Sequence, residues 1–357
     1  MNVKQVIEQV TAWVEQEGQQ IPGFCGAHLM GSILSMPHEA PFPPYHDVDL
    51  TIVVRDAAHV TATHDAAAGG LILEYSTVSI QRYRTAEQVL SDPELAANLA
   101  ANSILADPDG LLQPLQRSVA ARYADRQWVE ARCAVEHGIA MQVIQELRNA
   151  ATPADALWFL CSVVLFLSGQ LAEATLQSPT HRRSLVLLRD VLQAAGRRDL
   201  HEATLQLMGW AHLRRQEVEA YLQDCAEAFD RAAAVSHTPV PFQVKFQPHI
   251  RPYIINGAQE MIDQGFHREA MFWISGFLLF ANAAIQADAP PDEKPYFQGK
   301  LDRLIAEMGL SAPGAIATRV REAEALAAAI AAVAQVLIEQ RSQTEPRSFR
   351  ALMACPS

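Results

Sequence analysis

The sequence has few cysteines, and none of them forms a pair at metal-binding spacing. It contains five in 357 residues, at Cys25, Cys133, Cys161, Cys225 and Cys355. Disulfide frameworks and zinc sites depend on closely spaced cysteines or on cysteines with partner histidines. The scattered thiols, mostly with apolar neighbours, therefore argue against both and are typical of a reducing cytoplasm. The N-terminal segment carries acids throughout, so we expect an amphipathic helix there and not a signal peptide.

Basic residues are also in short supply. The chain has 28 Lys and Arg against 40 Asp and Glu, a formal net charge of −12. A surface that binds nucleic acid needs a basic patch to neutralise phosphates. We therefore expect no nucleic-acid partner, whereas a cationic small substrate is compatible with the charge balance.

Uninterrupted apolar runs of membrane-spanning length are lacking. The two uncharged runs, residues 156–172 and 270–287, contain polar residues such as Ser162 and Gln170 in the first and Asn282 and Gln286 in the second. Both fall at the short, polar end of the range for a membrane span. We expect two buried bundle helices and no membrane association, which fits a cytoplasmic location.

Strand signals nearly vanish after Tyr123, and no repeat of fixed period is present. Helical patterns cover residues 127–150, 153–177, 181–195, 200–208, 214–235, 259–264, 267–287, 300–308 and 313–340. The sequence therefore predicts an α+β domain over residues 1–125 and an all-helical domain over residues 126–341. Residues 342–357 are polar and unpatterned, and we expect them to form a mobile tail.

The first 125 residues alternate between helical and extended patterns. We expect helices at 3–14 and 57–68, short helices from Thr85 and Asp92, and strands at 24–30, 47–54, 71–83 and 103–106, with another helix from Leu111. Asp107 and Asp109 lie in the turn before that last helix. Turn formation and helix capping explain them better than catalysis.

The stretch from Met30 to Val54 has the strongest chemical signal. Asp47 and Asp49 open a run that ends in β-branched residues, which favours a buried strand. Side chains two apart on a strand share a face, so the two carboxylates are expected roughly 7 Å apart along the backbone. Two carboxylates on one face can share divalent cations such as Mg²⁺, which prefer oxygen ligands.

Three further residues complete the pattern. Gly31 and Ser32 precede the Asp pair, and Glu74 lies within the next extended segment. Glycine lets backbone N–H groups approach a phosphate closely, and a serine hydroxyl adds a donor. A pair of divalent ions about 4 Å apart can stabilise an attacking oxygen and the phosphate that it attacks. The set predicts phosphoryl or nucleotidyl transfer.

This ordered set resembles the nucleotidyltransferase superfamily with the DNA polymerase β-like fold, in particular its small-molecule branch, which includes kanamycin-type aminoglycoside nucleotidyltransferases. The resemblance covers roughly residues 20–125 and rests on Gly31, Ser32, Asp47, Asp49 and Glu74. It implies a mixed-sheet catalytic domain followed by a helical-bundle domain. It also implies that Asp47, Asp49 and Glu74 bind two Mg²⁺ ions and that Gly31 and Ser32 hold the triphosphate.

The implied reaction is transfer of a nucleoside monophosphate from a nucleoside triphosphate to a hydroxyl of a small molecule, with release of pyrophosphate. The expected catalytic residues are Asp49 and Glu74. The general base could be any of four glutamates, Glu74, Glu130, Glu136 or Glu146. Additional cleft candidates lie before helical segments, at Arg182, His267, Arg268 and Glu269.

Two other functions are compatible with the same residues. The acceptor could be a protein side chain, as in AMP-transferring members of the superfamily, or the chain could be a non-catalytic relative that binds nucleotide or a partner. Three clustered acids argue against the second alternative, because their mutual repulsion is unfavourable without metal. A homodimer is compatible with the sequence.

Overall fold

The computed structural model describes residues 1–60, 64–178 and 180–344, and its fold is α+β. The chain divides into two compact units. The first comprises residues 1–136, 170–179 and 331–357, and the second comprises residues 137–169 and 180–330. The domain boundaries expected at residues 125 and 341 stay predictions.

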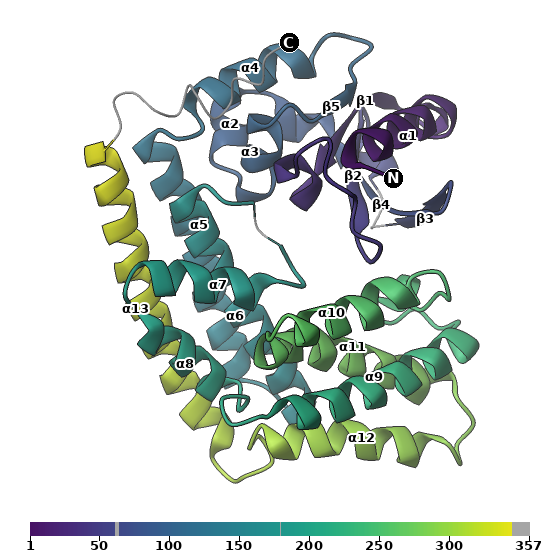
Figure 1. Cartoon of the computed structure of the whole chain (residues 1–357), viewed down its shortest axis with the longest axis vertical. Helices are drawn as coiled ribbons and strands as arrows, with labels where there is room; N and C mark the ends of the chain where they lie inside the picture. Colours follow the sequence, from purple (N-terminus) through teal and green to yellow (C-terminus); the bar gives the residue numbers. More distant parts are fainter. Residues whose placement is uncertain (61–63, 179, 345–357) are drawn as a thin grey trace. The chain divides into compact units, whose positions relative to one another are not determined.

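A five-stranded mixed sheet forms the centre of the first unit (Figure 1). Its strands are β1 (Phe24–Met30), β2 (Asp47–Val54), β3 (His64–Ala68), β4 (Leu71–Ser79) and β5 (Ile104–Ala106), in the spatial order β3-β4-β2-β1-β5. Strands β2 and β4 are parallel, and the other neighbouring pairs are antiparallel. Parallel neighbours begin at the same edge of the sheet, so the first residues of β2 and β4 lie together.

One face of this sheet packs on helix α1 (Val3–Gln16). Val3, Val6, Val10 and Val14 recur at helical spacing and are fully buried. They meet the inward residues of β2, such as Leu50 and Ile52. The helix begins with a capping box in which the Asn2 side chain accepts from the N–H of Gln5.

The opposite face is covered by α2 (Ala86–Leu90), α3 (Pro93–Ala100) and α4 (Leu112–Arg122) (Figure 1). Val53 and Val78 point to this side from β2 and β4 and pack with Leu95, Leu99 and other helix residues. Because side chains alternate along a strand, Asp47, Asp49, Thr51 and Val53 share this face of β2.

The helix expected over residues 57–68 is wrong where the structure describes this segment, and residues 61–63 lie outside the described residues. The structure has a short 3₁₀ helix at Ala57–His59 and the edge strand β3, which pairs antiparallel with β4. Alanine favours helix by only a fraction of a kcal/mol per residue, and the ladder with β4 outweighs that preference. The strand expected to run to Tyr83 also ends at Ser79, where a 3₁₀ turn over Ile80–Tyr83 follows.

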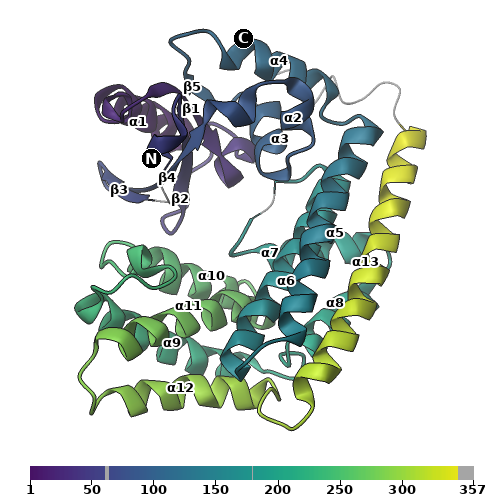
Figure 2. The ribbon, with the colours of Figure 1, turned by 180° about the vertical axis from the view of Figure 1, so that it is seen from behind.

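The second half of the chain is helical, as expected. Its helices are α5 (Arg126–Arg148), α6 (Pro153–Thr175), α7 (Ser184–Ala194), α8 (Arg198–Leu207), α9 (Arg215–Val235), α10 (Gly257–Asp263), α11 (His267–Asp288), α12 (Lys294–Glu307) and α13 (Ala315–Thr344). Helix α11 packs against α7, α9, α10 and α12 in the second unit (Figure 2). Its apolar residues are buried on several sides, which explains its weak amphipathic pattern.

Helices α6 and α11 are each long and apolar enough to cross a membrane by length and composition. The most apolar stretch of α6 is 61% buried inside the protein, and that of α11 is 67% buried. A buried core helix of a soluble protein has the same properties, so neither helix is more than weak support for a span.

Residues 342–344, expected to belong to a mobile C-terminal tail, are instead the last residues of α13, which continues to Thr344. The rest of that segment, including Cys355, lies outside the described residues. The other four cysteines are free and buried. Burial raises the pKa of the thiols of Cys133, Cys161 and Cys225 to about 12.

Candidate metal and nucleotide site

Three carboxylates converge at the edge of the sheet where β2 and β4 begin. Asp47 and Asp49 are the first and third residues of β2, and Glu74 is the register partner of Asp49 on β4. One carboxylate oxygen from each of the three side chains lies within 4.8 Å of the others. All three residues are half-buried, so a small ligand can reach them from solvent.

The strand geometry accounts for this convergence. Alternation sends Val48 and Leu50 into the core under α1 and leaves Asp47 and Asp49 on the opposite face. The parallel register then sets Glu74 directly beside Asp49. The donor set is all-oxygen and anionic, which fits a hard divalent cation better than a soft metal.

Gly31 lies against one of these acids. It begins a 3₁₀ turn (Gly31–Ser35) directly after β1, with a φ of +72°, in the left-handed region that favours glycine. A Cβ atom at this position would lie only 2.6 Å from Oδ2 of Asp49. Glycine therefore allows this close approach without displacing the Asp49 carboxylate.

The backbone N–H of Gly31 is already engaged. It donates to Oδ1 of Asn98 on α3, at 3.2 Å. A role for Gly31 in holding a phosphate therefore rests on the shape of its turn and not on that N–H group. In the part of the chain that the structure describes, no hydrogen bond involves the hydroxyl of the neighbouring Ser32, whose carbonyl accepts from Ser35.

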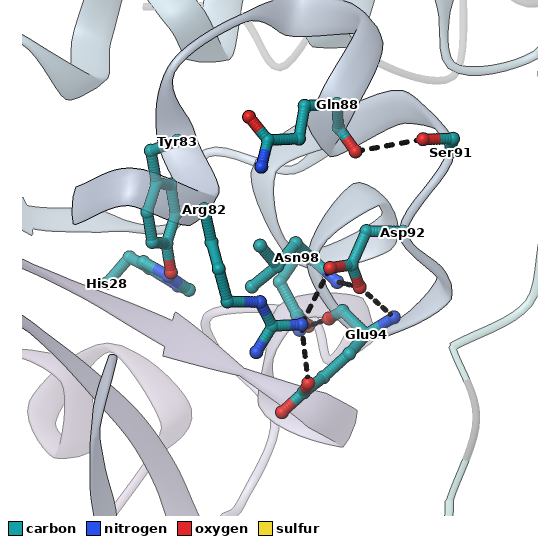
Figure 3. A network of polar contacts seen from close by, with 9 residues as sticks. His28, Arg82, Tyr83, Gln88, Ser91, Asp92, Glu94 and Asn98 are labelled. Carbon is teal, nitrogen blue, oxygen red and sulfur yellow. Dashed lines mark hydrogen bonds and ion pairs between the residues drawn. The ribbon is translucent and has the colours of Figure 1, made fainter. Parts of the chain in front are cut away.

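A polar network holds α3 in place next to this turn (Figure 3). Asp92 caps the helix by accepting from the N–H groups of Glu94 and Leu95. Arg82, in the 3₁₀ turn after β4, donates to Asp92 at 2.6 Å and to Glu94 at 2.8 Å. Burial opposes the charge of Arg82, but these two hydrogen bonds raise its pKa above the usual value.

His28 lies on β1, two residues before Met30, and is the register partner of Thr51 on β2. It is fully buried, and its Nε2 is 2.8 Å from the hydroxyl of Tyr83, while Nδ1 is 3.0 Å from the carbonyl oxygen of Leu29 (Figure 3). A carbonyl only accepts, so Nδ1 carries the proton and Nε2 accepts from Tyr83. Burial lowers the pKa of His28 to about 4.

Sequence patterns did not single out Asn98, Arg82 or His28. A polar residue in a short helix is normally expected on the surface, so the local sequence does not indicate that Asn98 is buried. The apolar neighbours of His28 in β1 suggest a buried histidine, but nothing local shows that Tyr83 is its partner.

The expected alternatives for the general base differ in their surroundings. Glu130 is half-buried and forms an ion pair with Arg126, and Glu146 is exposed and accepts from Gln142. Glu136 is half-buried, and burial, with a smaller effect of the Glu173 charge, raises its pKa to about 8.

The additional cleft candidates make contacts within the second unit. Arg268 forms a bidentate ion pair with Glu202, and Glu269 is buried 3.1 Å from Nε2 of His201. Arg182 is buried, donates to the carbonyl of Tyr253 and lies over its ring. His267 is the half-exposed first residue of α11. These contacts join α8 to α11 and the residues just before α7 to the segment before α10, and a role in binding substrate stays a prediction.

Asp107 and Asp109 have the structural roles expected of them. Asp107 accepts from the N–H groups of Leu111, Leu112 and Gln113 at the start of α4. Asp109 forms an ion pair with Arg55. This second Asp-x-Asp pair therefore serves as a capped turn.

A scan of the chain against models of known protein families finds no match, and a search of curated protein sequences finds no relative. The function must therefore be inferred from the residues and geometry of the site itself.

Proposed function

We propose that the chain is a divalent-metal-dependent nucleotidyltransferase that transfers a nucleoside monophosphate to a hydroxyl of a small molecule. The observation that carries the proposal is the convergence of Asp47, Asp49 and Glu74 within 4.8 Å, beside the turn that begins at Gly31. Oxygen atoms of three carboxylates this close together can coordinate one hard divalent cation at the same time.

The finer fold is part of this proposal. A mixed sheet with Gly-Ser after β1, Asp-x-Asp at the start of β2 and a third acid on the parallel neighbour β4 supports a DNA polymerase β-like catalytic core. The helical second half supports the helical-bundle domain that the resemblance implies.

Asp47, Asp49 and Glu74 are the residues that would hold Mg²⁺, two ions in the expected arrangement. Mg²⁺ is bound in proteins by one or two carboxylates together with substrate phosphates, which matches this half-buried set. When bound, the ions neutralise charge on the phosphates and lower the pKa of a bound hydroxyl.

The residues of the chain have separate tasks in the proposed reaction. The Ser32 hydroxyl donates to an oxygen of the triphosphate, and the Gly31 turn leaves room for the phosphates to approach. Glu74 accepts the proton of the acceptor hydroxyl if it is not used wholly as a ligand. The acceptor oxygen forms a bond to the α-phosphorus, and the bond to pyrophosphate breaks. Positioning and charge neutralisation supply most of the rate enhancement.

The test measures nucleotide binding and turnover on the same protein. Thermal denaturation with each nucleoside triphosphate, with and without Mg²⁺, should show stabilisation that requires the metal. Pyrophosphate release in the presence of candidate acceptors should fall in Asp47→Asn and Asp49→Asn by more than about 100-fold, since loss of a residue that only supports a metal ligand costs about 10- to 100-fold.

Asp109→Asn is the matched control, because it alters an Asp-x-Asp pair that serves a turn. Pyrophosphate release that survives in both Asp47→Asn and Asp49→Asn would refute the proposed role of the acids. Labelled nucleotide that appears on protein instead of small molecules would identify a protein acceptor, and stabilisation without metal would indicate a non-catalytic binding protein.

A further inference from the structure

Asn98 uses both ends of its side-chain amide, and one end contacts the turn beside the acids. It is buried, with 7% of its surface exposed. Its Oδ1 accepts from the N–H of Gly31 at 3.2 Å, and its Nδ2 donates to the carbonyl of Glu94 at 2.5 Å. An amide is the side-chain group that offers a donor and an acceptor in this fixed arrangement.

The second bond fixes the direction of the first. Glu94 lies one helical turn before Asn98 on α3, so the bond from Nδ2 to its carbonyl orients the amide along the helix. Helix α3 is itself held at its first turn by the Asp92 cap and by Arg82 (Figure 3). The oxygen of Asn98 is therefore presented to Gly31 from a well-anchored helix.

Gly31 transmits this restraint to a carboxylate. Its Cα lies so close to Asp49 that an added Cβ would be 2.6 Å from Oδ2. A shift of the turn toward Asp49 would clash with that oxygen, and a shift away would remove this contact. The position of the Gly31 turn thus limits the orientations that the Asp49 side chain can adopt.

We propose that Asn98 is a positioning residue that holds the Gly31 turn against Asp49 and thereby orients this carboxylate for a divalent cation. The inference rests on the proposed function, because it requires that the three acids bind metal. Asn98 itself touches neither metal nor substrate in this arrangement. Groups that orient metal ligands typically contribute about 10- to 100-fold in metal affinity.

The experiment measures binding of Mn²⁺, used as a probe for the divalent site, by electron paramagnetic resonance of the free ion during titration of the full chain. Asn98→Leu keeps a side chain that branches at Cγ and removes both hydrogen bonds. We expect its Mn²⁺ affinity to fall about tenfold or more. Asn98→Asp keeps an oxygen that can accept from Gly31, so its affinity should be closer to that of the wild type.

Asn149→Leu is the matched control. Asn149 makes the same kind of bond, from Nδ2 to the carbonyl four residues earlier, but at an exposed position directly after α5 in the second unit. Its Mn²⁺ affinity should equal that of the wild type. Thermal denaturation in EDTA shows whether each variant is folded, and Asn98→Ala replaces Asn98→Leu if the latter does not fold.

The possible failures are distinguishable. If the wild type binds Mn²⁺, Asp49→Asn does not, and a folded Asn98→Leu or Asn98→Ala binds as tightly as the wild type, the positioning role is refuted and the proposed function stands. If the wild type binds no Mn²⁺, or if Asp49→Asn binds it equally well, the metal site and this inference fail together.

Discussion

Asp49 on β2 and Glu74 on β4 are direct partners in a parallel β-ladder. Their side chains meet because the register of the sheet places them on one face, and not because they are close in sequence. Asp47 joins them from two positions earlier on the same strand. The sheet therefore fixes the backbone positions of the three acids, which is a suitable support for a site that must bind a cation in a fixed geometry.

Gly31→Ala should disrupt the acid cluster as well as the turn. Alanine is strained at a φ of +72°, and its Cβ would also meet Oδ2 of Asp49. We expect a loss of stability of about 1 kcal/mol or more, together with weaker Mn²⁺ binding.

Gly110→Ala separates these two effects. Gly110 has a similar φ of +67°, but nothing lies within 4 Å of an added Cβ. It should share the backbone strain and leave Mn²⁺ affinity unchanged. Equal Mn²⁺ affinities for the two variants would show that the contact with Asp49 does not matter to the site.

His28 should make the protein less stable in mild acid. Its folded-state pKa of about 4 lies below the ordinary value of 6.5, so the unfolded chain takes up the proton first. The contribution is fully present above pH 6.5 and is lost as the pH falls toward 4. At 1.36 kcal/mol per pH unit over roughly 2.5 units, the loss amounts to about 3 kcal/mol.

Urea denaturation between pH 7 and pH 4 measures this loss. His28→Gln should remove most of the His28 contribution to the slope, while His249→Gln, at an exposed position, should keep the wild-type slope. If His28→Gln and the wild type have the same pH dependence, burial of His28 does not set acid stability.

Burial of Glu136 should make the protein less stable as the pH rises, which is the opposite of the effect of His28. Its folded-state pKa is raised to about 8 by burial, so the folded protein holds a proton that the unfolded chain releases above pH 4.5. This contribution to stability is complete below pH 4.5 and is lost as the pH rises through 8. Glu136→Gln should therefore gain stability relative to the wild type as the pH increases from 5 to 9.

The free energy of unfolding at pH 5, 7 and 9 measures this effect. Glu146→Gln, on the same helix but exposed, should show no such gain. A constant difference between Glu136→Gln and the wild type across this range would contradict the raised pKa.

The Arg132–Glu173 ion pair should be costly to break. Both side chains are buried, at 0% and 1% exposure, and Arg132 also donates to the carbonyls of Leu90 and Tyr123. Glu173→Gln leaves a buried guanidinium uncompensated, and we expect a loss of about 3–5 kcal/mol.

The exposed pair of Arg126 and Glu130 provides the comparison. Glu130→Gln should cost less than about 1 kcal/mol, because water screens an exposed pair. The double variant Arg132→Met with Glu173→Leu should be more stable than Glu173→Gln alone. If Glu173→Gln cost no more than Glu130→Gln, the buried pair would not be a major contributor to stability.

Much of the secondary structure follows from local patterns. The spacing of Val3, Val10 and Val14 predicts α1, and the β-branched run predicts β2 with Asp47 and Asp49 on one face. The prediction of a helix over residues 57–68 was wrong because the alanines there favour a helix locally, whereas β3 forms by pairing with β4, which no local pattern shows. Such pairing overrides a weak local preference.

The sequence by itself determined most of the helices and strands and the identity of the three acids, because alternation and helical periodicity are properties of neighbouring residues. Only the tertiary structure decided that Glu74 lies beside Asp49. It also decided that Asn98 accepts a hydrogen bond from the N–H of Gly31 and that the hydroxyl of Tyr83 donates to the buried His28. These contacts join segments far apart in the chain. They depend on sheet register and on how helices cover a sheet, which no local pattern of residues contains.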